Sequence, residues 1–400
     1  MDAPTLLNRV TREYMLKDFF SNILNEIQHH RVQLEKVAAK RPDCCSIVNS
    51  QTESNAATAR RPTEKKGVVK MRYKLLIVLF AVAFCMSVAP VQAGPVEFKF
   101  AHFINPIEPG PESGLWIEKD VNEKISDKVD AKFFHSGQVG SAIEIIKKVR
   151  MGALQGAYLT GNYAPELNDK FGIGTLAYCM DSYEKWETLL ANAALREELF
   201  TSLKNKGLLV LDLCYFGRYG IASTKPFSTL EELQSLKMRT TQARYPLAFW
   251  KALGVNPLPM AWADVFPGLK QGVVDGTDQT KNVVRMRLTD VCKYFTETRH
   301  MVGLFFFVVN DKWWNGLDAD TRNALGAIIA ENMAKAREKS KQLTIEADAA
   351  LKDKGVTVTE LAPAEMAKFK EKEMKVWDQF EGDIGKEWLD KIKAMNASME

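Results

Sequence analysis

A single long helical pattern, residues 318–354, most constrains what this chain can fold into. It begins with an acidic segment, DADTR, and stops at Gly355, as expected for a helix with acidic groups in its first turn and a glycine after its last. At 1.5 Å per residue the helix would be about 50 Å long, which exceeds the width of a typical lobe. We therefore expect it to cross from one lobe of the protein to another.

From residue 94 onward, strand and helix patterns alternate, which predicts an α/β protein with mixed sheets. The predicted strands cover residues 96–102, 129–134, 208–215, 235–240 and 305–310. Besides the long helix, predicted helices cover residues 113–128, 141–149 and 363–375, and the tail is expected to be helical through Trp388. A capping box, Ser141 with Glu144, marks the start of the second helix. The run LLVLDLCY at 208–215 is nearly all apolar, as in the centre of a parallel sheet.

Residues 71–93, MRYKLLIVLFAVAFCMSVAPVQA, have the layout of a secretory signal peptide. Arg72 and Lys74 precede an apolar run that ends at Pro90, and small residues suit cleavage after position 93. An uncleaved membrane anchor is the alternative, but the run is shorter than the about 18–20 residues that a spanning helix needs. We therefore expect the chain to be exported across a membrane.

Seventy residues precede this signal, although a signal peptide normally begins a chain. They include a polar run, SQTESNAATARRPTEKK, that has the composition of a disordered linker. Our hypothesis is that Met71 is the true initiator and that residues 1–70 come from a start assigned too far upstream. A cytoplasmic extension in front of a membrane anchor is the alternative.

The positive charge of the chain is concentrated before residue 94. The whole chain has 54 Lys+Arg and 50 Asp+Glu, a formal charge of +4, whereas residues 1–93 hold 14 basic and 8 acidic residues. The remaining 40 basic and 42 acidic residues give −2. This part of the chain lacks the sustained positive field of a nucleic-acid-binding protein, so no nucleic-acid partner is expected.

The residue types that metal sites and catalysis require are sparse after residue 93. Cys179, Cys214 and Cys292 form no C-x-x-C pair, so neither a zinc site nor a disulfide framework is indicated. Buried free thiols are expected, with a Cys179–Cys214 bridge as the alternative in an oxidising compartment. Only three histidines and none of the common hydrolase, nucleotide or metalloprotease motifs occur there. We therefore predict a binding protein without metal or cofactor rather than an enzyme.

Two arginines, Arg218 and Arg239, lie near the ends of predicted strands. A guanidinium pairs bidentately with a carboxylate and keeps its charge when desolvated. Ligands of open α/β sheets bind at the ends of strands. The two arginines would therefore suit an organic anion, with ordinary surface ion pairs as the alternative.

Four motifs surround these arginines at regular spacing: SLKMR at 235–239, GVNPLPMAWADVFPGLKQGVVDGTDQ at 254–279, GQVG at 137–140 and TRHMVGLFFFVVNDKWWNGL at 298–317. Together they resemble the signature of the solute receptors of TRAP (tripartite ATP-independent periplasmic) transporters, of the dicarboxylate-receptor type. The resemblance covers essentially all of residues 94–400.

The resemblance implies a two-lobed periplasmic binding protein, of α/β class, with mixed sheets in both lobes and a long helix spanning the lobes. We expect lobe 1 to comprise residues 94–216 plus about 305–344, and lobe 2 to comprise residues 217–304 plus about 345–400. The receptor would be a monomer that captures a carboxylate-bearing organic acid and delivers it to the membrane subunits of the transporter. The alternatives are a sensory ligand-binding protein of the same fold, or an enzyme with the arginines as a substrate clamp.

The resemblance also implies the ligand contacts. Arg239 would clamp the ligand carboxylate, Arg218 would be a second arginine, and Trp262 would line the pocket. Gln279 stands where the family has Asn, and Asp278 stands where it has Glu. The further expected contacts are His102, Thr160, Asn162 and Gln242. Arg244 closely follows the clamp and is an additional candidate for a second anionic group on the ligand.

Overall fold

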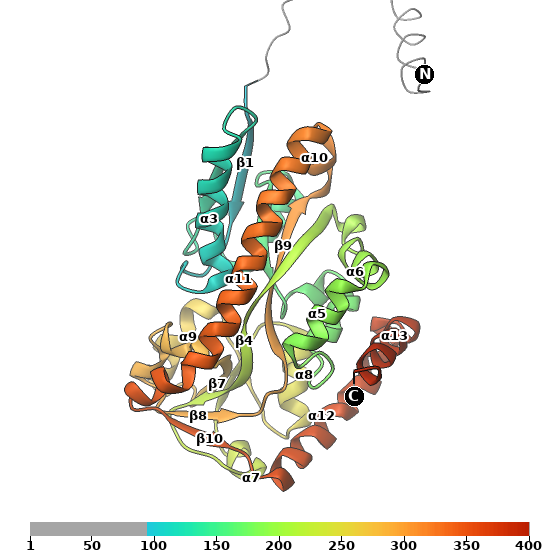
Figure 1. Ribbon diagram of the computed structural model, residues 1–400. Coiled ribbons are helices and arrows are strands. Elements are labelled where there is room, and N and C mark those ends of the chain that lie inside the picture. The colour runs from blue at the N-terminus through green and yellow to red at the C-terminus, as the bar shows by residue number, and fades with distance from the viewer. Residues whose placement is uncertain (1–93, 400) are drawn as a thin grey trace, which may run out of the picture. The chain divides into compact units, whose positions relative to one another are not determined.

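Strands and helices alternate along residues 94–399, which are the residues that the computed structural model describes (Figure 1). The predicted signal peptide at 71–93 and the segment 1–70 lie outside the described residues and stay predictions. Within 94–399, no helix is both long enough and apolar enough to cross a membrane.

The elements are as follows. The strands are β1 (Val96–Ala101), β2 (Val129–Phe134), β3 (Gly156–Thr160), β4 (Leu208–Ser223), β5 (Met238–Thr240), β6 (Leu258–Pro259), β7 (Gly276–Thr280), β8 (Tyr294–Glu297), β9 (Val302–Asn310) and β10 (Thr357–Glu360). The α-helices are α3 (Pro109–Lys124), α4 (Ala142–Arg150), α5 (Tyr183–Ala191), α6 (Ala193–Phe200), α7 (Leu230–Gln234), α8 (Arg244–Ala252), α9 (Trp262–Lys270), α10 (Asp311–Gly316), α11 (Ala319–Asp353), α12 (Pro363–Ile384) and α13 (Lys386–Ala397). Short 3₁₀ turns are η1 (Ala164–Glu166), η2 (Asp169–Gly174), η3 (Lys204–Lys206), η4 (Lys281–Val284) and η5 (Leu288–Asp290).

The sheet has two halves that share one long strand, β4. The strand order is β2-β1-β3-β9-β4-β7-β5-β6, with β8 beside the far end of β4 and β10 beside β8. Residues 208–218 of β4 pair with β9 in the first half, and residues 219–223 pair with β7 in the second. Parallel pairs (β1 with β2 and β3, β5 with β6 and β7) coexist with antiparallel ones, so the predicted mixed α/β sheet is confirmed.

The neighbours of β4 correct one prediction. The apolar run at 208–215 is not the centre of a parallel sheet, because both β9 and β7 run antiparallel to β4. The run is apolar because both faces of the strand are buried. Leu213 and Tyr215 belong to one core cluster, and Cys214 and Phe216, which point the other way, belong to a second. An unbroken apolar strand therefore indicates that both of its faces are buried. It does not show whether the neighbouring strands are parallel or antiparallel to it.

Helix α11 crosses between the halves as predicted. Its N-cap, Asp318, accepts the backbone N–H of Thr321 at 2.9 Å, and the helix ends before Gly355, which has φ 67°. The first part packs in a core cluster with α3, β1 and β2, whereas Leu351 near its end packs in another cluster with Phe295 of β8. Figure 1 shows it running past α3 and β4 towards β10.

Several predicted boundaries shift, and each shift has a local cause. Helix α3 begins at Pro109, four residues early, because proline is accommodated in the first turn of a helix. The capping box of Ser141 and Glu144 is present at α4, as predicted. The helix predicted at 363–375 continues to Ile384, and Gly385, at φ 91°, separates it from α13.

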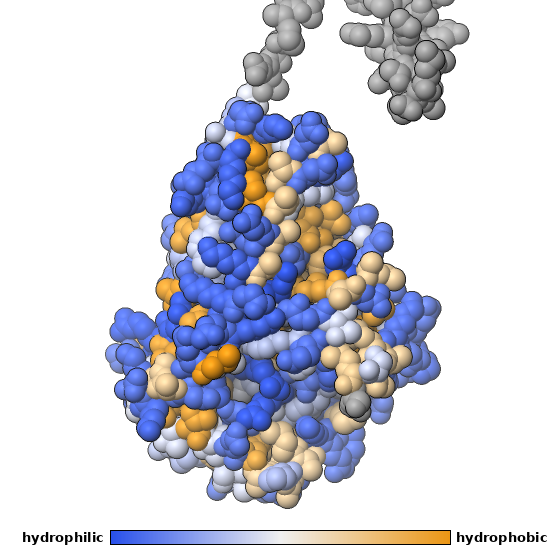
Figure 2. Space-filling view, viewed as in Figure 1, coloured by the Kyte–Doolittle hydropathy of each residue, from blue (hydrophilic) through white to orange (hydrophobic). Residues whose placement is uncertain are grey.

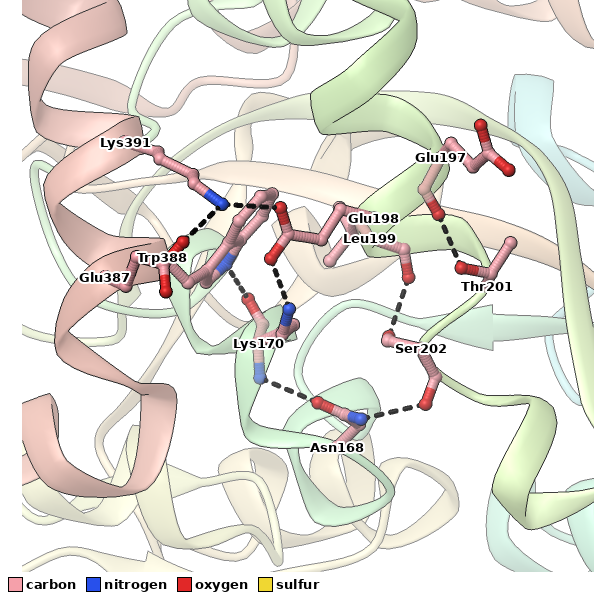
Figure 3. A network of polar contacts seen from close by, with 10 residues as sticks. All are labelled: Asn168, Lys170, Glu197, Glu198, Leu199, Thr201, Ser202, Glu387, Trp388 and Lys391. Atoms are coloured by element: carbon pink, nitrogen blue, oxygen red, sulfur yellow. Dashed lines mark hydrogen bonds and ion pairs between the residues drawn. The ribbon is translucent and has the colours of Figure 1, made fainter.

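The C-terminal helix α13 packs against α5 and η2 and forms an ion pair with α6 (Figure 3). The indole of Trp388 donates to the backbone oxygen of Lys170 at 3.0 Å, and Lys391 pairs with Glu198 at 3.0 Å. Trp388 also packs in the same core cluster as β3 and the first part of β4. The tail thus contacts segments that we assigned to the other lobe, and the lobe boundaries stay a prediction.

The three described cysteines are buried free thiols, which confirms the preferred reading of Cys179, Cys214 and Cys292. Burial raises the pKa of each thiol, so all three are held in the neutral form. On the face shown in Figure 2, hydrophilic residues predominate and the hydrophobic areas are small and separated.

Candidate functional site

A cavity of about 490 Å³ is lined by residues from both halves of the sheet. One wall follows the carboxyl ends of β1, β2 and β3: Phe103, Ile104, Ser136, Gly137, Gly140–Ile143, Thr160–Tyr163 and Gly174. The opposite wall comes from the β5, α9 and β7 region: Arg239, Thr241, Gln242, Ala261–Ala263, Asp278 and Gln279. The two long strands between them contribute Phe216, Tyr219, Val302, Leu304 and Phe305. The cavity therefore lies where an open α/β sheet binds ligands.

The turn between β2 and α4 brings the GQVG motif to the cavity. Ser136, Gly137 and Gly140 have positive φ angles of 55°, 71° and 118°. A Cβ at Gly140 would lie 2.8 Å from the Oε2 of Glu144, so glycine is needed there. The Glu144 carboxylate in turn accepts from the N–H of Ser141 at 2.8 Å, which fixes the start of α4 at the cavity.

Arg239 reaches the cavity from β5 and is only 5% exposed. Its Nε and Nη2 donate to the backbone oxygen of Met260 at 3.1 and 2.9 Å, and its Nη1 donates to the hydroxyl of Thr241 at 3.3 Å. The guanidinium carbon lies 5.9 Å from the centre of the Trp262 ring. Burial lowers the pKa of Arg239, and the carboxylate of Asp278 opposes that shift.

Two N–H groups of the Arg239 guanidinium have no hydrogen-bond partner among the described residues. A guanidinium has five N–H bonds, one on Nε and two on each Nη. The three hydrogen bonds above use one on Nε, one on Nη1 and one on Nη2. One N–H on each Nη remains, and N–H groups of a guanidinium form strong hydrogen bonds with a carboxylate. Within residues 94–399, no carboxylate oxygen lies within 4.0 Å of this guanidinium.

Asp278 faces the same cavity from β7 and is 3% exposed. Its Oδ1 is buried without a hydrogen-bond partner. Burial raises the pKa of Asp278 to about 6, against the opposing effect of the Arg239 guanidinium. The side chain is therefore ionised at neutral pH, and the cavity holds one positive and one negative group that are not in contact.

Most of the other predicted contacts also lie in the lining: Trp262, Gln279, Thr160, Asn162 and Gln242. The hydroxyl of Thr160 is buried without a partner, and the amide of Asn162 donates to the hydroxyl of Tyr219 at 3.4 Å. The Oε1 of Gln279 accepts the backbone N–H of Thr280 at 2.8 Å, so its amide nitrogen remains for a ligand.

Three candidates lie elsewhere. Arg218 is inside β4 rather than at a strand end, is not in the lining, and interacts electrostatically with Tyr183 and with α5. His102 is fully buried outside the lining; its Nδ1 accepts the N–H of Ile104 at 2.8 Å, and burial lowers its pKa to about 3. It is therefore a neutral core residue. Arg244 is not in the lining either, because its side chain is paired with acidic residues of η2 and α12.

The apolar part of the cavity lining was not predicted from the sequence. Phe103, Phe216, Tyr219, Leu304 and Phe305 all face the cavity. Most of them lie in or beside strands whose apolar pattern is that of ordinary core residues, so the pattern alone gives no signal for a pocket. Within the described residues, no group of three or more His, Cys, Asp or Glu side chains could hold a metal ion.

Comparison of the sequence with protein families and with curated proteins identifies its relatives. The family model of the bacterial extracellular solute-binding proteins, family 7, matches residues 100–383. The chain is 28% identical over 320 residues to the C4-dicarboxylate-binding periplasmic protein DctP of Rhodobacter capsulatus, covering 79% of this chain and 96% of that protein. It is 26% identical over 327 residues to the protein of the same name from Vibrio cholerae, covering 80% and 96%.

Solved structures share the fold. A TRAP periplasmic solute-binding protein from Shewanella oneidensis, with bound succinate, gives a TM-score of 0.71 at 21% identity, covering 76% of this chain and all of that one. The sugar acid-binding protein DctPAm from Advenella mimigardefordensis, in complex with galactonate, gives a TM-score of 0.72 at 23% identity, covering 77% and 99%. The predicted two-lobed binding-protein fold with mixed sheets is thereby confirmed.

Proposed function

The chain belongs to the bacterial extracellular solute-binding proteins of family 7, the solute receptors of TRAP transporters, and on that premise we propose that it captures an organic acid with Arg239 as the carboxylate clamp. The protein is a receptor and not an enzyme. The acid occupies the cavity between the two halves of the sheet, and the loaded receptor delivers it to the membrane subunits of a TRAP transporter. The receptor acts as a monomer.

The observation that carries this proposal is the state of Arg239. Arg239 is 5% exposed. Among the described residues, two N–H groups of its guanidinium have no hydrogen-bond partner, and no carboxylate lies within 4.0 Å of it. A buried charge without a partner is unfavourable by several kcal/mol. A ligand carboxylate removes that cost because it supplies both the opposite charge and two acceptors. The free energy gained on binding is therefore concentrated at this end of the cavity.

Binding also favours a closed form. The lining comes from segments on both sides of the long strands, so a ligand that contacts Thr160 and Asn162 as well as Arg239 joins both walls. A ligand shifts a conformational equilibrium by the difference in its affinity for the two forms. Contacts from both walls exist only when the walls are close together, so binding selects the closed receptor, as in other hinged binding proteins.

A thermal-shift screen tests the function. Protein purified from cells that express the complete chain is mixed with organic acids and, as a control, with neutral sugars of similar size. A ligand present at 100 times its dissociation constant stabilises the folded state by about 2.7 kcal/mol, which is visible as a rise in Tm. We expect at least one acid, and no neutral sugar, to raise the Tm. A rise with sugars alone would contradict a carboxylate receptor.

Export is a separate part of the proposal. Relatives are periplasmic proteins by name, and we propose that the signal peptide at 71–93 directs this chain to the same compartment. N-terminal sequencing of the protein recovered from the periplasm is expected to begin at Gly94. A mature protein that retains residues upstream of Met71 would contradict both this cleavage and our hypothesis on the start of translation.

A further inference from the structure

Glu108 carries a buried carboxyl group that the proposed binding site does not use. It occupies the N-cap position of α3, is 0% exposed and is not in the cavity lining. Among the described residues, neither of its side-chain oxygens has a hydrogen-bond partner. A carboxylate loses its hydration when it is buried and is favoured there only if it is both paired and hydrogen-bonded. This environment therefore favours the protonated, neutral form of Glu108.

Arg285 reaches this carboxyl group from the second half of the sheet. It directly follows η4, which comes after β7, whereas Glu108 lies between β1 and α3 in the first half. The Nε of Arg285 donates to the backbone oxygen of Ile107 at 2.8 Å, and its Nη2 donates to the same oxygen. The Nε also lies 3.7 Å from the Oε1 of Glu108. The guanidinium thus joins the two halves, and these two groups donate to Ile107 rather than to the carboxyl group.

The other groups around Glu108 supply no further positive charge. Glu112, one turn along α3, carries like charge and is paired with Lys339 of the neighbouring helix α11 at 2.6 Å (Figure 1). Asn282 of η4 is neutral, and its amide donates to the backbone oxygen of Phe216 at 2.7 Å. Burial raises the pKa of Glu108 to about 8, although the Arg285 guanidinium opposes the rise. With the halves in this arrangement, Glu108 is mainly protonated at neutral pH.

From this contact between the halves we propose that closing of the receptor around its ligand buries Glu108 and takes up one proton from solvent on its carboxyl group. The inference rests on the proposed function, since it requires a receptor that opens and closes on an acid. Water already reaches the edge of the contact, because the Arg285 side chain is 32% exposed and Ile107 is 37% exposed. Separation of η4 from the start of α3 hydrates the carboxyl group.

The direction of the pH dependence follows from the two forms. In the open form the hydrated carboxyl group has a pKa near the ordinary value for glutamic acid, about 4.3. In the closed form its pKa is about 8. Because the closed form holds the proton to higher pH, ligand binding is strongest at low pH and weakens as the pH rises between these two values. The receptor therefore binds the acid together with a proton and releases both when it opens.

Calorimetric titration counts this proton. The tightest-binding acid from the thermal-shift screen whose own pKa is below about 5 is titrated at about pH 7 in HEPES and in Tris, which have different enthalpies of ionisation. The difference between the two measured heats gives the number of protons taken up. For the wild type we expect between about 0.5 and 1 proton per ligand, and an affinity that falls roughly fivefold or more from about pH 7 to about pH 8.5.

Variants assign the proton to Glu108. Glu108→Gln resembles the neutral carboxyl group but cannot be ionised, so it should bind the acid without proton uptake and with nearly the same affinity at both pH values. Glu123→Gln is the matched control, because Glu123 lies in the same helix and its side chain is 61% exposed. Asp278→Asn is a second control, because burial also raises the pKa of Asp278. Both controls should take up the proton like the wild type.

The outcomes separate the inference from the function. A wild type that binds an acid without proton uptake, and equally well at both pH values, would overturn the inference while the receptor function stands. Uptake that persists in Glu108→Gln, or that disappears in Asp278→Asn, would also overturn it, because the proton would then be held elsewhere. If no organic acid binds the wild type, both the inference and the proposed function are wrong.

Discussion

Arg239 and Arg244 lie five positions apart, yet they occupy opposite environments. Arg239 is 5% exposed, bonds only to neutral oxygens and has no acidic side chain of the described residues within 4.0 Å. The Arg244 side chain is 40% exposed and is paired with Asp169 and, at 2.9 Å, with Asp383. One guanidinium has unused donors inside a cavity, and the other has its charge matched within the chain.

The difference shows how partners decide the role of an arginine. Arg244 at the start of α8 joins η2 and α12, so its ion pairs connect three segments of the fold. Its charge is matched by two carboxylates of the fold and therefore contributes to structure. Arg239 costs folding free energy because its charge is buried, and this cost is offset when an anion binds. Substitutions at the two positions should therefore separate binding from stability.

The largest expected effect is on binding at Arg239. Arg239→Met removes the charge and both free N–H groups while keeping much of the side-chain volume. It should weaken binding of the acid found in the screen by about 3–5 kcal/mol, or roughly 100-fold to several thousand-fold. Calorimetric titration measures this loss, and Arg244→Met is the control that should bind the acid like the wild type. Equal losses of affinity in the two variants would contradict the assignment of ligand binding to Arg239 and of a structural role to Arg244.

The next effect is on stability at Asp278. Its pKa is raised from 3.8 to about 6 in the folded protein, chiefly by burial. The folded state therefore holds this proton to higher pH than the unfolded chain does, so the group destabilises the fold increasingly between these values and fully above pH 6. Asp278→Asn should raise the free energy of unfolding without ligand by roughly 1–3 kcal/mol at about pH 8.

The expected gain in the free energy of unfolding depends on pH, so a measurement at a second pH serves as the control. At about pH 4, Asp278 is largely protonated in the folded state, and the difference between variant and wild type should nearly vanish. Urea denaturation at the two pH values measures it. A difference of the same size at both would show that the carboxylate charge is not its cause.

The smallest effect is on stability at Arg244. Its ion pairs are partly exposed, so Arg244→Met should lower the free energy of unfolding by about 1 kcal/mol, less in high salt. Arg287→Met is the matched control, because that side chain is 81% exposed and, among the described residues, is paired only with Asp290, three residues away. It should change stability by less than about 0.5 kcal/mol. Equal effects of the two substitutions would contradict a structural role for Arg244.

The sequence was sufficient for the architecture where local signals are strong. The long helix begins after Asp318 and ends before Gly355 as predicted, because an N-cap and a glycine stop mark both ends. The capping box of α4 was predicted for the same reason. The direction of the neighbours of β4 was predicted wrongly, since two-sided burial produces the same apolar run in parallel and antiparallel sheets.

The site was predicted in part. Arg239, Trp262 and Asp278 lie in the cavity because family motifs place them on β5, α9 and β7. Arg218 does not line the cavity, because β4 continues through residue 223 and carries Arg218 within the strand. The ion pairing of Arg244 could not be predicted from the sequence either, since its partner Asp383 lies 139 positions away. Tertiary contacts decide which arginine has no acidic partner, and the spacing of residues along the sequence does not show those contacts.

A crystal structure of the protein with the tightest-binding acid from the screen tests the central claim most directly. We predict that the ligand carboxylate accepts one N–H bond from each Nη of Arg239, in addition to the bonds that this guanidinium already makes to Met260 and Thr241. A structure in which the carboxylate binds elsewhere in the cavity, with those two N–H groups still unused, would contradict the account.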